Sequence, residues 1–341
     1  MQSAAELKIW PVVRAVPNAR VFGAIVLLCI VASAAFASWL PLQVSILTVF
    51  LFAGPHNWFE LRYFLMRLPV RFGRSRNFFL TAFAGLGVLT LTYVSLPLLY
   101  RTALWSEEAW STVIASWNSL FLFWLLLLIW LRGKRKARAS WTWTIPVGLA
   151  LCSLNWLSPD LFSLAIVYVH PLVALWFLDR HLSRTRPEWL RVYRRCLCVL
   201  PFVLIVMVWR LSQASPLPDS NGLFWRITQH SGAEVLPQVS SHLLVSVHLF
   251  LEMLHYFVWI VALPLIARAA MKRFWDVKTV PVARHAKGFP RLVAGLLVLA
   301  LAAVVLLWLS FSIDYSTTRD VYFTIAIAHV LAEAPFLLRM I

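Results

Sequence analysis

The sequence predicts an all-α, polytopic integral membrane protein, a helical bundle of about ten transmembrane helices that forms a single transmembrane domain over residues 1–341. Three observations predict this class. Of the 341 residues, 61% are hydrophobic and only 13% are charged, which leaves too little polar surface for a soluble domain of this length. The apolar residues gather into runs of about 20, the length that crosses a bilayer. The 18 tryptophans are typical of helices anchored at lipid–water boundaries.

The apolar runs follow one another along the whole chain. They predict spans at residues 21–39, 43–67, 78–99, 116–132, 142–158, 160–179, 194–211, 241–267, 292–312 and 320–339. A tight turn at Ser158-Pro159-Asp160 separates the fifth span from the sixth. The stretch 212–240 is rich in proline and predicts a linker, which we favour over a short interfacial helix at 223–227.

The basic residues support this number of spans by their positions. Lys and Arg total 31 against 14 Asp and Glu, giving a net charge of +17. They concentrate in the loops after even-numbered spans, at 67–76, 132–138, 180–195 and 268–291, and the other loops hold few, with Arg101, Arg226 and Arg319 as exceptions. The positive-inside rule then predicts that both termini are cytoplasmic. We expect a bacterial inner (plasma) membrane, with membrane lipid rather than nucleic acid as the partner of this charge.

Three glutamates lie inside the spans, and each follows a histidine by four residues. The pairs are His56–Glu60, His248–Glu252 and His329–Glu333. A spacing of four residues puts both side chains on one face of a helix. At 3.6 residues per turn, His255 lies about 20° from His248 around the helix and Glu252 about 40° on the other side, so these three share a face. Ionisable groups inside a membrane are costly and are normally retained for function.

Histidines from four helices are predicted to meet near the middle of the membrane. With alternating topology, the depths of His56, His170, His255 and His329 differ by only about 8 Å. Imidazole with carboxylate suits iron, zinc or copper, and several histidines with an open position suit non-haem Fe(II) and O2. Glu252-x-x-His255 also has the spacing of di-iron carboxylate bundles, which leaves open one ion or two.

These patterns define the candidate site residues. We predict five metal ligands, His56, His170, His248, His255 and His329, and two catalytic carboxylates, Glu60 and Glu252. The alternative for His248 and His329 is a structural hydrogen bond to the glutamate that follows. The alternative for Glu60 and Glu333 is a hydrogen bond to a ligand histidine, or an ion pair with Arg62 or Arg339.

Two stretches of the chain resemble a known family. Gly54-Pro55-His56-Asn57-Trp58-Phe59-Glu60 is similar to the Pro-His-Gly motif, with a following acidic residue, of the Brp/Blh family of membrane β-carotene 15,15′-dioxygenases. Residues 254–264 resemble the late histidine-bearing helix of that family. Asn57 stands in place of the usual glycine and Glu60 in place of aspartate. The resemblance implies a helical membrane bundle whose iron is held by histidines from separate helices.

The sequence therefore predicts a membrane non-haem iron oxygenase, a metal-dependent enzyme that uses Fe(2+) and O2. Its expected substrate is a lipid-soluble small molecule, with a carotenoid or another isoprenoid as the leading candidate. Three alternatives remain open: a proton-coupled transporter with a His/Glu relay, a b-type haem protein, and a metal-binding assembly subunit without turnover. The substrate and the oligomeric state are not predicted.

Overall fold

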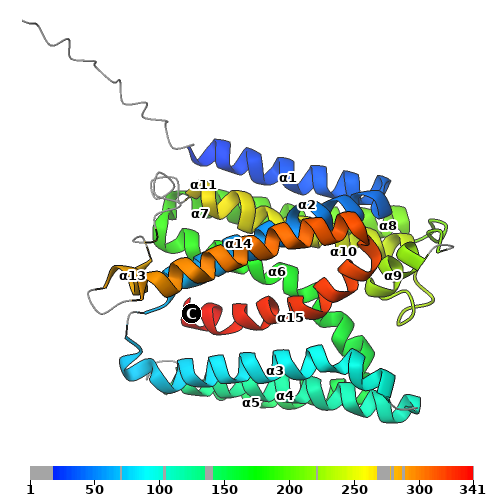
Figure 1. Cartoon of the computed structure of the whole chain (residues 1–341). Helices are drawn as coiled ribbons and strands as arrows, with labels where there is room; N and C mark the ends of the chain where they lie inside the picture. Colours follow the sequence, from blue (N-terminus) through cyan, green and yellow to red (C-terminus); the bar gives the residue numbers. More distant parts are fainter. Residues whose placement is uncertain are drawn as a thin grey trace, which may run out of the picture.

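A computed structural model describes residues 18–69, 71–102, 105–134, 141–219, 222–266, 277, 280–285 and 289–340. Within these ranges the chain is a bundle of long helices that run roughly along one axis, and no strand is present (Figure 1). Eight helical stretches are long and apolar enough to cross a membrane. The all-α bundle is therefore confirmed, and its composition is that of an integral membrane protein.

The helices follow the predicted order of spans. They are α1 (Ala19–Trp39), α2 (Pro41–Arg67), α3 (Arg76–Thr102), α4 (Glu107–Gly133), α5 (Thr144–Leu157), α6 (Pro159–Thr185), α7 (Pro187–Leu197), α8 (Val199–Leu211), α9 (Gly222–His230), α10 (Ser241–Tyr256), the π-helical segment η2 (Phe257–Ala262), α11 (Leu263–Ile266), α13 (Pro281–Arg284), α14 (Pro290–Ile313) and α15 (Tyr315–Met340), with a short 3-10 turn η1 (Gly73–Ser75) before α3. The eight candidate spans leave out α2 and the 14-residue α5.

Several segments on which the predicted topology depends lie outside the described residues. These parts are 1–17 and most of two basic loops, at 135–140 and 267–276. The sidedness of the two termini therefore stays a prediction.

Proline and capping residues account for where many helices begin. Proline occupies the first turn of α2, α6, α7 and α14, where its missing N–H costs nothing. Asn18 caps α1 by accepting a hydrogen bond from the Val21 N–H at 2.9 Å, and Ser106 caps α4 through Ala109 at 3.2 Å. Each cap satisfies a backbone donor that the helix leaves unpaired.

The predicted linker at 212–240 is wrong over its middle, where α9 forms. Ile227 of α9 is buried in an apolar cluster with Leu42 of α2 and Val245 of α10. The helix forms because its apolar face packs onto the bundle, and this packing is a tertiary effect that a nine-residue segment does not reveal by itself.

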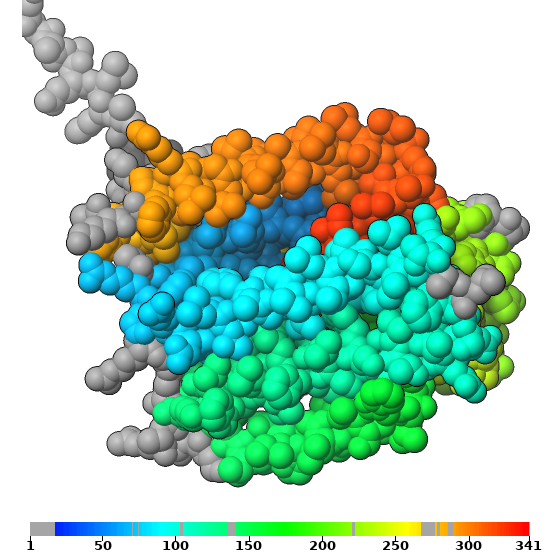
Figure 2. Space-filling model, turned by 60° about the horizontal axis from the view of Figure 1, so that its bottom comes forward, coloured from blue at the N-terminus to red at the C-terminus, as the bar shows by residue number. Residues whose placement is uncertain are grey.

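The helices form a central group with others around it. In Figure 1, α1 lies at one side of the bundle and α3, α4 and α5 at the opposite side, with α2, α6, α10, α14 and α15 between them. Packing contacts join α10 to α1, α2 and α6, and join α15 to α3. Figure 2 shows a hollow between α14 and α3, with α2 and α15 at its floor. The helices α2 and α6 both pack against α10 and against α15, so these four helices surround the centre of the bundle.

Candidate metal centre

The four central helices depart from regular geometry near one another. Three carry an interior proline and the fourth, α10, runs into the π-helical segment η2. A proline leaves a backbone carbonyl without its helical N–H, and π-turns occur frequently at functional sites. The positions concerned are Pro55 beside His56, Pro171 beside His170, Pro335 near Glu333, and η2 directly after His255 and Tyr256. Irregular membrane helices are typical of segments that line a site.

Four histidines, one from each of these helices, converge in the interior. Ring centroids are 5.3 Å apart for His56 and His255, and 5.2 Å for His56 and His329. His170 completes the group, with its ring 4.7 Å from that of His255 and 5.0 Å from that of His329. This cluster contains four of the five histidines that the sequence predicts as ligands.

Two buried glutamates complete the cluster. Glu333 Oε2 lies 3.2 Å from His170 Nδ1. Two groups have ligand atoms that all lie within 4.8 Å of one another: His56, Glu60, His255 and His329 form the first, and His170, His255 and Glu333 form the second. Glu60 was predicted as a catalytic carboxylate, and here it lies among the histidines. His255 belongs to both groups, which therefore adjoin.

Hydrogen bonding fixes which nitrogen His56 presents to the cluster. Its Nδ1 lies 3.0 Å from the Phe52 carbonyl oxygen. Since a carbonyl only accepts, Nδ1 carries the proton and Nε2 keeps its lone pair. A backbone acceptor of this kind commonly orients a metal-ligating histidine.

The donor atoms of the cluster fit a metal ion. Among the described residues, no hydrogen-bond partner faces His56 Nε2, either ring nitrogen of His255, or the carboxylate oxygens of Glu60. Each unsatisfied buried polar atom costs about 1–3 kcal/mol. A cation bound by imidazole nitrogens and carboxylate oxygens would remove this cost at several atoms together.

His248 and Glu252 lie away from the cluster, although they share a helix face with His255. The ring of His248 lies 5.1 Å from that of His230 and 5.7 Å from that of Tyr168. Glu252 Oε1 accepts a hydrogen bond of 2.8 Å from the Tyr256 hydroxyl. Neither residue belongs to the two metal-capable groups found among the described residues. Seven residues of rise, about 10 Å, separate His248 from His255 along the helix axis.

A cavity of about 340 Å³ connects the cluster with these two residues. The four clustered histidines, His248 and Glu252 all line it. Much of the remaining wall is apolar or aromatic, with Leu164, Val167 and Ile327 among the lining residues. The volume is at the lower end of the range for ligand cavities. The cluster is therefore one end of a mostly apolar chamber, which we call the central cavity.

Tyr256 and His230 also line the central cavity, and Arg319 lies with His230 in a neighbouring pocket; the sequence did not single out these three. The ring of Tyr256 lies 4.5 Å from that of His56. His230 lines the central cavity although it appeared to lie in a loop. Arg319 drew notice only as a basic residue on the predicted outer side. That exception to the charge pattern was the signal that could have marked it.

Comparison with known proteins gives no assignment. No family model, no curated protein and no solved structure matches the chain. The similarity to the Brp/Blh motifs therefore remains a resemblance of two short stretches.

Proposed function

We propose that this protein is an integral-membrane, non-haem iron oxygenase that acts on a lipid-soluble substrate with O2. The observation that supports this most directly is the buried cluster of four histidines and two glutamates. His56 Nε2, both ring nitrogens of His255 and the Glu60 carboxylate have no hydrogen-bond partner there among the described residues. Iron bound there would supply the activation of O2, a chemistry suited to histidine and carboxylate ligands with an open position. Two groups that share His255 are compatible with one ion or two.

The rest of the cavity suits the handling of an apolar substrate. Its apolar wall would hold a carotenoid or another isoprenoid beside the cluster, as the Brp/Blh resemblance implies. Glu252 and Tyr256 share a hydrogen bond of 2.8 Å beside His56. In this proposal they hold a proton within reach of the reacting end of the substrate.

The proposal also includes the finer membrane topology. We propose that α2 and α5 lie in the bilayer with the eight candidate spans, that both termini are cytoplasmic, and that the membrane is a bacterial inner membrane. The central position of α2 among the other helices supports its inclusion.

Metal analysis and an optical spectrum of the detergent-purified chain test the proposal. We expect stoichiometric iron, and its loss in His56→Ala and in His255→Ala. His242→Ala is the matched control on α10, because His242 Nε2 contacts the Ser38 carbonyl at 3.0 Å, outside the cavity. Folded wild-type protein that acts on its substrate without iron would disprove the proposal. Zinc in place of iron would overturn the oxygenase chemistry while leaving the metal centre.

A proton-coupled transporter is the second candidate, because polar groups continue beyond the cluster. His248 and His230 extend them toward α9, and at the other end the Tyr63 hydroxyl lies 3.3 Å from His181 Nδ1. Such a series could form a proton relay. Proton uptake by reconstituted vesicles that depends on Glu60 and Glu252, in metal-free protein, would favour the transporter.

The remaining alternatives have less support. A haem plane must fit between its two axial imidazoles, and four pairs of the cluster, with ring centroids 4.7–5.3 Å apart, leave little room for one. The centroids of His255 and His329 are 6.1 Å apart, so this pair is the better candidate for haem ligation. A Soret band would reverse that argument. An assembly subunit would contain the metal but show no substrate-dependent use of O2.

A further inference from the structure

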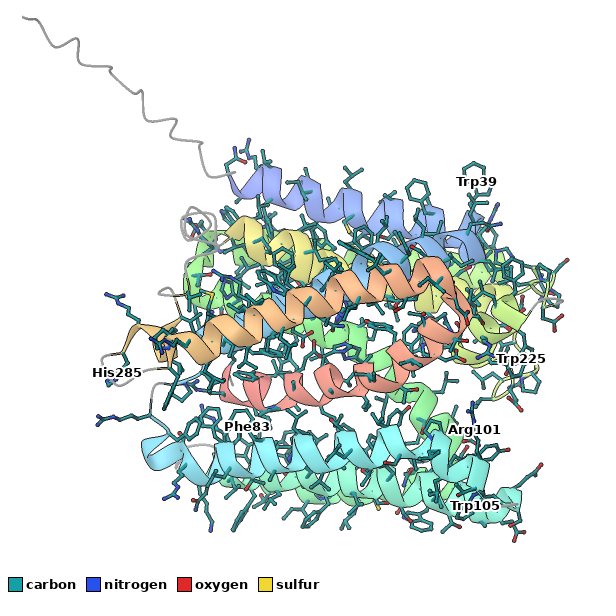
Figure 3. The ribbon with its side chains drawn as sticks, in the orientation of Figure 1. Trp39, Phe83, Arg101, Trp105, Trp225 and His285 are labelled. Carbon is teal, nitrogen blue, oxygen red and sulfur yellow. The ribbon has the colours of Figure 1, made fainter. Side chains whose placement is uncertain are left out.

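A second pocket lies beside α9, at the end of the bundle where Trp39, Trp105 and Trp225 gather (Figure 3). We call it the α9 pocket, and its volume is about 340 Å³. Its lining includes Trp225, Arg226, His230, Arg319, Asp320 and Phe323. Tryptophans concentrate at membrane boundaries, so this end of the bundle corresponds to one lipid–water boundary.

Arg319 of α15 is the unusual residue of the α9 pocket. Only 3% of its surface is exposed. No ion pair among the described residues includes it, and its Nε has no hydrogen-bond partner there. Its recorded contacts are a long hydrogen bond of 3.5 Å to the Arg226 carbonyl and a position 4.6 Å above the Phe323 ring. A guanidinium has five N–H donors, and burying it without a counter-charge is costly.

The other charged groups of the pocket do not compensate Arg319. Asp320 is ion-paired with Arg226. Burial, then the charges of Arg319 and His248, hold the pKa of His230 well below its usual value, so this imidazole is neutral near pH 7 and can donate one N–H. Gln229 has a buried Oε1 without a partner, and rotation of its amide would present two further donors. The described lining therefore carries one uncompensated positive charge.

Glu252 is a buried acid of the neighbouring central cavity. Its Oε1 accepts the hydrogen bond from Tyr256. It forms no ion pair with Arg319. A ligand oxyanion in the α9 pocket would supply the close, bidentate partner that a guanidinium prefers.

The α9 pocket adjoins the central cavity. Tyr93, Gln229, His230 and Phe323 line both. Arg319 and His329 lie ten residues apart on α15, which is about 15 Å of helix. One elongated molecule could therefore place a polar head at Arg319 and a chain position beside the histidine cluster.

We propose that the α9 pocket binds the anionic head group, a carboxylate or a phosphate, of an amphiphilic substrate whose apolar body lies in the central cavity. This inference rests on the proposed function, because it narrows the lipid-soluble substrate of the same site to one with an anionic head, which excludes an uncharged carotene. It places the reacting position of the substrate about 15 Å from its head.

Ligand affinity of the detergent-purified full-length chain tests the proposal. The probes are palmitate and hexadecyl phosphate, with methyl palmitate and hexadecanol as neutral molecules of the same chain length. Tryptophan fluorescence is a suitable signal because Trp225 lines the pocket. We expect both anions, or one of them, to bind at least tenfold more tightly than the neutral probe of the same chain. The stronger anion distinguishes a fatty-acid type of ligand from a lipid phosphate.

Arg319→Gln should remove this preference, and Arg319→Lys should keep part of it, because lysine retains the charge without the planar fork. Arg101→Gln is the matched control, an exposed arginine at the same end of the bundle (Figure 3). Equal wild-type affinity for anionic and neutral probes would overturn the proposal, and this comparison needs no variant to fold. An unchanged preference in folded Arg319→Gln would overturn it as well.

Iron content, measured on the same samples, separates the two proposals. Iron-containing protein without an anion preference would contradict the head-group site alone. Iron-free, active protein with an Arg319-dependent anion preference would contradict the oxygenase and leave the pocket as a lipid-binding site.

Discussion

The stretch α10–α11 and the helix α14 are similar in length but occupy different surroundings. In the apolar 18-residue window of the candidate span Ser241–Ile266, 67% of the residues are buried inside the bundle, whereas 17% are buried in that of Pro290–Ile313. The first contains His248, Glu252 and His255, and the second has no ionisable residue after Arg291. Ionisable side chains therefore occur where protein, rather than lipid, surrounds the helix.

The difference extends to how each helix is held in place. Large buried side chains such as Phe250 and Trp259 pack around the α10 region. Leu299 of α14, in contrast, is 67% exposed on the surface of the bundle. In a membrane this exposed face of α14 is expected to contact lipid instead of protein. It should therefore tolerate the replacement of one apolar residue by another, but not a charged residue.

The largest expected effect comes from placing a charge on α14. Leu299→Arg should cost about 2.5–3.5 kcal/mol, the insertion penalty of a cation at the centre of a membrane helix. The measurement is the yield of membrane-extracted, monodisperse protein, with Leu299→Met as the control. Wild-type yield for Leu299→Arg would show that lipid does not contact α14 at this point.

An intermediate effect is expected where two outer helices approach closely. A methyl group added at Gly85 of α3 would collide with the Trp124 indole of α4, which donates to the Thr81 carbonyl at 3.0 Å. Gly85→Ala should therefore lower the free energy of unfolding by about 1–3 kcal/mol through overpacking.

The control for this change lies two residues away on the same helix. A methyl group at Gly87 meets nothing within 4 Å, so Gly87→Ala should leave the thermal midpoint in detergent unchanged or slightly raised. Equal midpoints for the two variants would contradict the α3–α4 packing.

The smallest effect concerns a polar contact away from the metal centre. Asn155 of α5 accepts a hydrogen bond from the Asn118 amide at 2.9 Å and donates to the Ala115 carbonyl at 2.8 Å. Asn155→Leu should lower stability by about 0.6–1.7 kcal/mol, the range for interhelical hydrogen bonds in membranes. Ser153→Ala is the control, because Ser153 bonds only within α5. A larger loss for Ser153→Ala would contradict this assignment.

The sequence predicts where the helices lie along the chain better than it predicts which helices pack against each other. Hydropathy and proline positions locate the apolar helices because both are properties of a single segment. The sequence predicts a linker where α9 forms, because the residues that bury Ile227 are distant in the chain. The turns of α4 before residue 116 begin with Glu107 and Glu108 and also contain Ser111 and Thr112, so hydropathy does not detect them, although Ser106 caps them.

The sequence predicts the kind of side chains at the candidate site, but only partly which of them lie together. Helical periodicity correctly places His248, Glu252 and His255 on a buried face. It does not determine which of them share a site, because position along the axis and packing between helices decide that. Glu333 illustrates the same limit: four-residue spacing pairs it with His329, yet it lies 3.2 Å from His170 of another helix.

The π-helical segment η2 has a consequence for how the gene can change. A π-turn contains one residue more than the α-turn it replaces, and in a regular helix the loss of one residue rotates all that follows by about 100°. Deletion of one residue within Phe257–Ala262 would restore an α-turn and leave His255 in place on its upstream helix. A single-codon deletion there would thus spare the ligand and, unlike a deletion in a regular helix, would not rotate the helix that follows.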